Sequence, residues 1–279
     1  MGRKIAIWTS LVGLALWSLF GYRAHPNTLV MLDVGQGLSV LFTDPAGWQL
    51  LYDGGPGGIT TAALGRTLPI WDTAIDVVVL SHPHVDHSAG LIAVLQRYQI
   101  GELWLTAPTN PDQTTQELLR LAKDRQIPLR LISRGTTIIT PGGAQLAILS
   151  PKSPYDPHPP PRAHAATPVI VIKSATTVML TGDLDAEDEN ELLGFCSVSV
   201  LCPAKVAVLQ VAHHGSKYVT SAAFLARFLP KIALISAGVD NRYHHPHPDT
   251  LERLSNQQIP YSRTDYSGTI TRQLTPSKQ

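Results

Sequence analysis

The feature that most constrains this chain is the run His82-Pro83-His84-Val85-Asp86-His87, which carries three imidazoles and one carboxylate within six residues. It comes just after the apolar segment 77–80, which has the character of a buried strand. Neutral imidazole and carboxylate are ligands for zinc and manganese. At the end of a buried strand, four such groups without an ion would leave several polar atoms to satisfy. The run therefore predicts a metal site, and its ligand number favours two ions.

The spacing within this run divides it into two pairs. His82 and His84 alternate along an extended segment, so their side chains point to the same side and can reach one ion. Asp86 and His87 fall on the turn into the next helix and can reach a second ion. The alternative is a polar turn that caps a helix, but helix N-caps use Ser, Thr, Asp or Asn rather than three histidines.

Length and composition set wide bounds. The chain has 279 residues, of which 44% are hydrophobic, which suffices for one large core or two small domains. The formal net charge of +1 argues neither for nor against a nucleic-acid partner. Cys196 and Cys202 either pair in an oxidising compartment or remain two small apolar side chains; we favour the unpaired state, because two cysteines make no disulfide framework.

The N-terminus carries a second signal. Arg3 and Lys4 precede residues 5–20, which contain no charge. The run is short for a membrane span, but Gly21 and Tyr22 extend it, and the aromatic residues Trp8, Trp17 and Tyr22 suit a membrane interface. We therefore predict an uncleaved transmembrane anchor in residues 1–24. The rest of the chain would then lie on the extracytoplasmic face, because positive residues stay in the cytoplasm.

Two other interpretations of the N-terminus remain open. A cleaved signal peptide would give a secreted protein, although Tyr22-Arg23-Ala24 lacks the usual small-x-small cleavage pattern. The run also suits the last helix of a larger membrane protein.

The order of expected elements indicates two sheets. Strand patterns come first and are followed by alternating strands and helices, twice over, which predicts two sheets with helices outside, in one domain over residues 25–279. Residues 151–168 contain seven prolines and predict an extended loop. The expected strands lie within 28–42, 48–52, 75–80, 102–106, 132–149, 169–181, 206–211, 232–236 and 269–274, and the expected helices are 88–98, 114–125, 185–193, 221–228 and 248–256.

The histidine run resembles the signature of the metallo-β-lactamase fold, a four-layer αββα sandwich. Further blocks occur in the order seen in the extracellular hydrolase domain of ComEC-type competence proteins, and the resemblance covers nearly all of residues 28–275. These blocks are Asp33-Val34-Gly35-Gln36-Gly37, Asp53-Gly54-Gly55, Gly182-Asp183, His213-His214-Gly215-Ser216 and His245-Pro246.

The resemblance implies a role for each motif residue. His82 and His84 would hold one ion, Asp86 and His87 the other, and Asp183 would bridge them. His213 is assigned as a ligand and His214 as a proton donor or phosphate contact, although these two roles are open to exchange. His245 is a further expected ligand. The catalytic set is then completed by Asp86, His214 and Ser216.

Several positions depart from the family pattern. The interval before Asp183 offers only His158 and His164 as an additional histidine, both in the proline-rich loop. Thr167 stands where the family usually has asparagine, Leu38 where an acidic residue is frequent, and Ala89-Gly90 where two glycines are usual. None of these changes removes a proposed ligand, but together they leave an altered activity open.

These observations predict a hydrolase that uses two divalent ions, zinc or manganese, because a two-metal site generates a nucleophile from water and polarises the attacked bond. The resemblance implies phosphodiester hydrolysis, with DNA as substrate and DNA-uptake channel proteins as partners. Lys217, Arg242 and Arg263 are candidate phosphate contacts. Asp33 and Asp53 either orient ligand histidines or simply cap turns.

Two rival functions remain. One is hydrolysis of another ester, a lactam or a thioester, since the same metal clamp stabilises several transition states. The other is a non-catalytic module that binds metal or DNA for an uptake apparatus.

Overall fold

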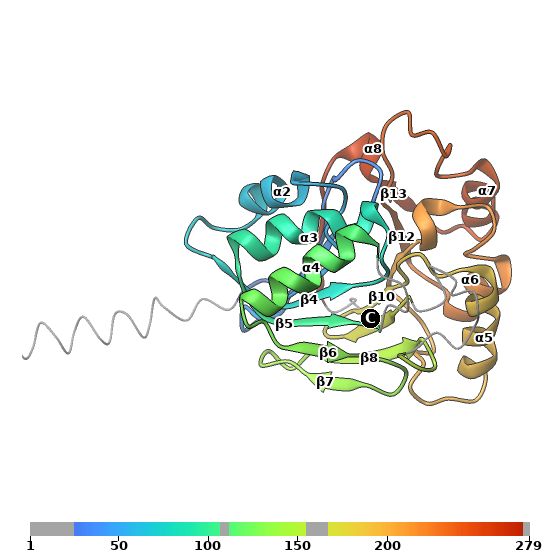
Figure 1. The fold of residues 1–279 in the computed structure, drawn as a ribbon. Helices are drawn as coiled ribbons and strands as arrows, with labels where there is room; N and C mark the ends of the chain where they lie inside the picture. Colours follow the sequence, from blue (N-terminus) through green and yellow to red (C-terminus); the bar gives the residue numbers. More distant parts are fainter. Residues whose placement is uncertain (1–24, 107–111, 155–166, 276–279) are drawn as a thin grey trace, which may run out of the picture.

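The computed structural model describes residues 25–106, 112–154 and 167–275. Within these residues two seven-stranded sheets pack face to face with helices on both outer faces (Figure 1), which confirms the predicted αββα sandwich. The first sheet has the order β14 (Ile270–Gln273), β1 (Thr28–Met31), β2 (Val40–Thr43), β3 (Gln49–Tyr52), β4 (Ala74–Leu80), β5 (Gln99–Leu105) and β6 (Leu129–Leu131). The second has the order β13 (Tyr261–Arg263), β12 (Ile232–Ile235), β11 (Val208–Gln210), β10 (Thr177–Leu180), β9 (Val169–Lys173), β8 (Gln145–Ser150) and β7 (Thr137–Ile139).

Three apolar clusters hold the layers together. Along β1, Leu29 and Met31 face the second sheet, whereas Val30 faces the outer helices, as the two-residue period of a strand requires. The helices on the first sheet are α2 (Ile59–Thr67), α3 (Val85–Arg97) and α4 (Gln113–Asp124). Those on the second are α5 (Ala186–Cys196), α6 (Ala222–Phe228) and α7 (Pro248–Asn256); the short α8 (Thr264–Ser267) and the 3-10 helix η1 (Ala212–Gly215) lie at strand ends.

Strand direction determines where the functional residues gather. Strands β3 to β6 are parallel, as are β10 to β13. The histidine run follows the C-terminal end of β4, Asp183 follows that of β10, and the His213-His214 pair follows that of β11. In parallel sheets such strand ends are the usual location of binding sites.

Some elements were not predicted. Helix α2 has the sequence Ile-Thr-Thr-Ala-Ala-Leu-Gly-Arg-Thr, in which threonine and glycine are weak helix formers. Its buried residues Ala63 and Leu64 join the apolar cluster beneath α3, so tertiary packing rather than propensity stabilises it. Strands β6 and β13 were also missed, because each has only three residues, too few to show a strand pattern.

The cysteine prediction was wrong in its preferred form. Cys196 ends α5, and the following loop returns Cys202 to within a Cα–Cα distance of 5.4 Å, where the two form a disulfide. The predicted anchor in residues 1–24 lies outside the described residues. Among the residues that are described, no helix is long and apolar enough to span a bilayer.

The first turn of α3 packs directly on the loop after β3, and Gly90 makes this approach possible. The Gly90 amide donates to the Gly55 carbonyl (2.9 Å). A Cβ atom added to Gly90 would lie only 1.7 Å from the Gly54 carbonyl oxygen. The departure at Ala89-Gly90 therefore keeps the glycine that the close contact needs.

We expect Gly90→Ala to lower the free energy of unfolding by about 3 kcal/mol, because overpacking forces the backbone apart. Gly65→Ala is the matched control: it makes the same change in helix α2, where an added Cβ meets nothing within 4 Å. That variant should gain about 0.5–1 kcal/mol. Denaturant titration of both proteins measures the difference, and equal stabilities would contradict the tight contact.

Candidate metal centre

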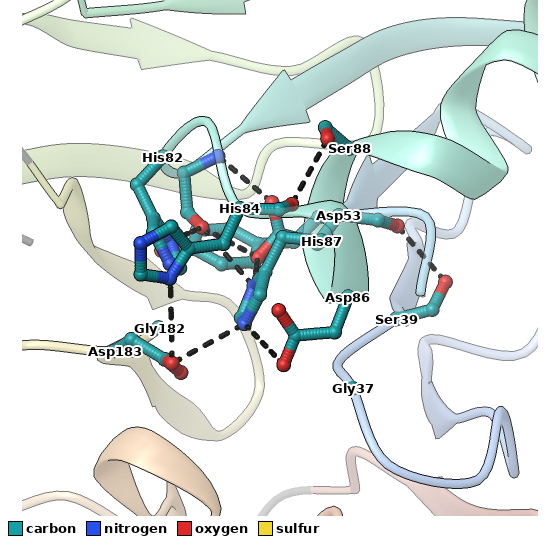
Figure 2. Close-up of polar contacts among 12 residues, drawn as sticks. Gly37, Ser39, Asp53, His82, His84, Asp86, His87, Ser88, Gly182 and Asp183 are labelled. Atoms are coloured by element: carbon teal, nitrogen blue, oxygen red, sulfur yellow. Dashed lines mark hydrogen bonds and ion pairs between the residues drawn. The ribbon is translucent and has the colours of Figure 1, made fainter. Parts of the chain in front are cut away.

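Side chains from both sheets converge at one place (Figure 2). His82 lies two residues beyond β4, His84 is the N-cap of α3, and Asp86 and His87 occupy its first turn. Asp183 reaches the same place from the loop after β10. The sequence therefore brings together residues that are about a hundred positions apart, because each follows a strand whose C-terminal end faces this region.

The Asp183 carboxylate is surrounded by imidazoles. Its Oδ2 atom lies 3.3 Å from His87 Nε2, 3.6 Å from His214 Nε2, 3.7 Å from His213 Nε2 and 4.0 Å from His82 Nε2. The second carboxylate, that of Asp86, has Oδ2 at 3.5 Å from His214 Nε2 and 3.9 Å from His87 Nε2. One carboxylate thus links all four histidines, and the other lies beside two of them.

Two overlapping sets of donors have the geometry to hold cations. In each set the ligand atoms lie within 4.8 Å of one another; the sets are His82, His87 and Asp183, and Asp86, His87 and His214. His84 belongs to neither, although its ring lies 4.5 Å from that of His82. The sequence spacing paired His82 with His84 and Asp86 with His87, and only the second pair occurs together in a set. The first pair is separated because the extended segment ends at His84, which is the N-cap of α3.

Buried donor atoms indicate that these residues suit a cation. His87 Nε2, His214 Nε2 and Asp183 Oδ1 are buried and make no hydrogen bond with any described residue. Leaving three such atoms unsatisfied costs several kcal/mol in total, at roughly 1–3 kcal/mol each. Imidazole and carboxylate together are ligands for divalent metals, so the chemistry of the set fits the ions that the sequence predicted.

The other ring nitrogen of each inner histidine is already engaged. His87 Nδ1 lies 2.7 Å from Asp53 Oδ2, and His214 Nδ1 lies 3.1 Å from the Ser236 carbonyl oxygen. Carboxylate and carbonyl oxygens only accept, so in the neutral form of both rings Nδ1 carries the proton and the lone pair is on Nε2. This is how proteins orient metal-binding histidines.

Asp53 is the centre of a second layer of hydrogen bonds. It is fully buried and adopts a positive φ of 60°. Ser81 donates to it twice, from its backbone amide to Oδ1 (2.8 Å) and from its hydroxyl to Oδ2 (2.6 Å). The same hydroxyl lies 3.0 Å from His82 Nδ1. Asp53 therefore orients His87 directly and His82 through Ser81.

Asp33, which the sequence left with the same two interpretations as Asp53, has a different role. Its Oδ1 atom accepts from the Gly35 amide (3.2 Å), so it caps the turn that contains it. That turn still contributes to the site, because Leu38 donates its amide to the Asp86 carbonyl (3.3 Å). A Cβ atom on Gly37 would lie 2.4 Å from the same oxygen, which explains the glycine there.

The electrostatics of the site favour positive charge. Burial alone lowers the pKa of His87, but the adjacent carboxylates of Asp183 and Asp53 outweigh it and raise that pKa well above its usual value. Burial raises the pKa of Asp183, yet the imidazoles of His87, His214 and His82 bring it well below its usual value. The site thus attracts positive charge, whether as protons or as metal ions.

His213 and His214 differ in accessibility. Both have positive φ values, 50° and 56°, which non-glycine residues rarely adopt. The His213 amide donates to the Gly182 carbonyl (3.0 Å), which ties the pair to the Asp183 loop. The His214 side chain is 3% exposed, whereas that of His213 is 31% exposed. His214 is thus the inner residue of the pair and His213 the outer one.

The remaining predicted site residues do not belong to the cluster of donors around Asp183. The His245 ring is 5.8 Å from that of His213, and burial with the neighbouring imidazoles lowers its pKa to about 4. The Ser216 hydroxyl accepts from the Tyr218 amide (3.5 Å), and its carbonyl accepts from the Thr250 hydroxyl (2.9 Å). Its backbone amide donates to the His213 carbonyl (2.9 Å), so Ser216 meets the cluster through its main chain. His158 and His164 lie outside the described residues.

Sequence reasoning missed two contributors to the site. Ser81 immediately precedes the histidine run, so its position was a usable signal. Ser236 acts on His214 through its backbone carbonyl, which no side-chain pattern reveals.

Residues 32–239 match the family model described as the metallo-beta-lactamase superfamily, so the chain belongs to that superfamily. The confirmed resemblance extends to ComEC-type competence proteins. The chain is 30% identical to ComE operon protein 3 of Bacillus subtilis over 86% of its own length and 32% of that protein. It is 28% identical to Recombination protein 2 of Haemophilus influenzae, over 90% of its own length and 29% of that protein. The chain thus spans about a third of the length of these curated relatives.

Solved structures agree on the fold. CmlA, described as a diiron beta-hydroxylase from Streptomyces venezuelae, has a TM-score of 0.59 at 15% identity, covering 89% of this chain and 55% of that one. Zn(2+)-bound PqqB from Methylobacterium extorquens has a TM-score of 0.57 at 12% identity, covering 88% of this chain and 99% of that one. At such identities the likeness concerns the fold alone.

Proposed function

We propose that this protein is a phosphodiester hydrolase that uses two divalent metal ions and cleaves DNA. The observation that carries the proposal is the convergence of four imidazoles on the Asp183 carboxylate at the strand ends of both sheets. The fold family supports a metal-dependent hydrolase. DNA as the substrate rests on the names of two relatives, Recombination protein 2 and Competence protein ComA of Neisseria gonorrhoeae.

The two overlapping donor sets are resolved by ligand chemistry. Nε2 of an imidazole has one lone pair and can serve only one ion, so His87 belongs to one set. We assign Asp86, His87 and His214 to the first ion and His82 with Asp183 to the second, with His84 beside His82. A carboxylate has two oxygens, so Asp183 would be able to serve both ions. Zinc and manganese both suit this mixture of nitrogen and oxygen donors.

Bound divalent ions supply Lewis acidity and lower the pKa of water, as in other two-metal hydrolases. The residues of the chain position these ions and receive the substrate. Asp53 and the Ser236 carbonyl hold the His87 and His214 rings with Nε2 facing inward. We assign the contact with the leaving group to His213, because it is the most exposed of the four imidazoles around Asp183. This exchanges the roles first given to His213 and His214.

Two pairs of a cation and an aromatic ring are close in sequence to the site histidines His213, His214 and His245. The Lys217 ammonium lies over the Tyr218 ring at 4.9 Å, and the Arg242 guanidinium lies over the Tyr243 ring at 4.8 Å. Tyr218 is 71% exposed and Tyr243 is 49% exposed. Exposed rings stack with bases and cations meet phosphates, so both pairs suit nucleic acid. The third candidate, Arg263, is instead held by two hydrogen bonds to Asp265.

We expect Lys217→Ala and Arg242→Ala each to weaken DNA binding and to reduce the slope of log affinity against log salt by about 1, because each removes one phosphate contact. Arg263→Ala is the matched control, since the Arg263 charge is already neutralised by Asp265. Fluorescence anisotropy with labelled DNA at several salt concentrations measures both quantities. A larger effect of Arg263→Ala than of the other two would contradict this assignment.

The proposed function is tested by a nuclease assay on single- and double-stranded DNA. We expect chelation to abolish cleavage and added zinc or manganese to restore it. Nitrocefin and bis-p-nitrophenyl phosphate, assayed in parallel, separate a lactam hydrolase from a phosphodiesterase. About two metal ions per chain with no turnover of any nucleic acid would replace the proposal with a non-catalytic binding module.

We also propose that residues 1–24 attach the hydrolase domain, residues 25–279, to the membrane and that the domain faces the extracytoplasmic side. The support is the uncharged run 5–20 after Arg3 and Lys4. DNA-uptake channel proteins are the proposed partners, on the strength of the competence relatives. A chain recovered only from the medium would favour secretion instead.

A further inference from the structure

A short turn presents two large apolar side chains to solvent far from the metal centre. Residues 69–72 lie in the connection from α2 to β4. The Asp72 amide donates to the Pro69 carbonyl (2.9 Å), which makes Ile70 and Trp71 the central residues of a β-turn. Ile70 is 90% exposed and Trp71 is 80% exposed. A tryptophan so exposed, with isoleucine beside it, marks a surface that contacts something apolar.

This turn lies at the edge of the sheet where the described chain begins. Strand β1 is antiparallel to β2, β2 is antiparallel to β3, and β3 is parallel to β4, so β1 and β4 run in the same direction. Their N-terminal ends therefore lie at one edge. His25 and Pro69 line the same cavity of about 530 Å³. Figure 1 shows the start of the described chain and the connection from α2 to β4 on the same side of the molecule.

Basic residues surround this edge. Helices α2, α3 and α4 each connect two neighbouring parallel strands, so their C-terminal ends all return to the edge from which β4, β5 and β6 begin. Each has a basic residue in its last turn: Arg66, Arg97 and Lys123. These residues complement the helix dipoles, and they also provide positive charge around the apolar turn. Of the nearby acids, Asp72 and Asp76 accept hydrogen bonds from Gln49.

We propose that the turn 69–72 inserts Ile70 and Trp71 into the headgroup region of an anionic lipid bilayer. The partner follows from the chemistry: tryptophan favours the membrane interface, and neighbouring lysine and arginine attract anionic headgroups. It also follows from position, because the described chain starts at this edge and the uncharged run 5–20 precedes it in the sequence. The inference rests on the proposal that those residues associate with the same bilayer.

The contact would set the orientation of the domain. Strand β4 has seven residues, which at about 3.3 Å each span about 23 Å. The turn precedes β4 and the histidine run follows it, so the metal centre would face away from the bilayer. DNA arriving from outside would then meet the Lys217 and Arg242 side without passing the lipid surface.

The test uses the full chain, which has no free cysteine because Cys196 and Cys202 form a disulfide. Ile70→Cys therefore takes a single environment-sensitive fluorophore. Val239→Cys is the matched control: Val239 is also apolar and 70% exposed, but it follows the C-terminal end of β12 near the metal centre. Both labelled proteins are reconstituted into vesicles of phosphatidylcholine and phosphatidylglycerol, with and without doxyl-labelled lipid.

We expect the label at position 70 to shift its emission to shorter wavelength and to be quenched by the doxyl lipid, while the label at position 239 does neither. Weaker quenching in vesicles of phosphatidylcholine alone would support the role of the basic residues, and equal quenching would overturn it. If the protein floats with the vesicles but position 70 is not quenched, the anchor stands and the turn proposal fails. If the protein does not float, both fail, whatever its nuclease activity.

Discussion

Replacing Asp183 with asparagine is expected to lower metal-dependent DNA hydrolysis by on the order of 10³-fold or more, because bound metal contributes several kcal/mol of transition-state stabilisation. The Asp183 carboxylate lies between 3.3 and 4.0 Å from four imidazoles, which include histidines of both donor sets. Asparagine keeps the shape but loses the charge, and its amide nitrogen cannot act as a second ligand oxygen.

The matched control for this variant is Asp185→Asn, two residues further along the chain. Asp185 is the N-cap of α5 and accepts a hydrogen bond from the Asp188 amide (2.8 Å). Asparagine caps helices as well as aspartate does, so this control should keep both fold and activity. Circular dichroism checks the folding of both proteins, and bound metal is counted by elemental analysis. A folded Asp183→Asn protein that cleaves DNA at the normal rate would contradict the proposed metal centre.

The sequence predicted the architecture well because its strongest signals lie at strand ends. Apolar runs such as 77–80 mark buried strands whatever their partners, and the ligand motifs follow them directly. Helix α2 was missed because its threonines and glycine give little local preference, and only packing of Ala63 and Leu64 selects the helix. The disulfide depends on how the chain turns after α5, which two cysteines alone do not specify.

The site was predictable at the level of motifs and less so at the level of roles. His213 and His214 are adjacent, and the sequence does not show that the folded loop leaves the His214 side chain 3% exposed and the His213 side chain 31% exposed. Ser216 was included for its place in the same block, but its hydroxyl accepts from the Tyr218 amide, and it is its backbone amide that meets His213. Position along the chain thus identifies the loop that reaches the site, whereas backbone conformation decides which residue of the loop enters it.

Asp53 and Asp33 also show that position in a motif does not determine the role of a residue, and comparing variants of the two tests this directly. Both aspartates lie in glycine-containing turns after apolar strands, and nothing in the sequence separates them. In the structure only Asp53 contacts a histidine of the cluster. The prediction is that Asp53→Asn weakens metal binding by roughly 10–100-fold, the usual effect of losing a group that orients a ligand.

The physical reason for this effect is a conflict of donors. The Asp53 carboxylate accepts from three groups: the Ser81 amide at one oxygen, and the Ser81 hydroxyl and His87 Nδ1 at the other. An asparagine side chain has only one oxygen, so its amide nitrogen must face either the Ser81 amide or His87. In the first orientation two donors oppose each other in a buried site, which costs about 1–3 kcal/mol. In the second, His87 must move its proton to Nε2, where it would point at the metal.

Asp33→Asn is the matched control, because a single accepted hydrogen bond from the Gly35 amide is one that asparagine also accepts. Calorimetric titration of zinc or manganese into each metal-free protein measures the affinities directly, and unfolding curves show whether either substitution disturbs the fold. Equal affinities in the two variants would mean that Asp53 does not orient His87 for a metal. A loss of metal affinity confined to Asp53→Asn would instead show that residues outside the ligand set determine how well the centre binds metal. They do so because a hydrogen bond at Nδ1 leaves the lone pair of each imidazole on Nε2.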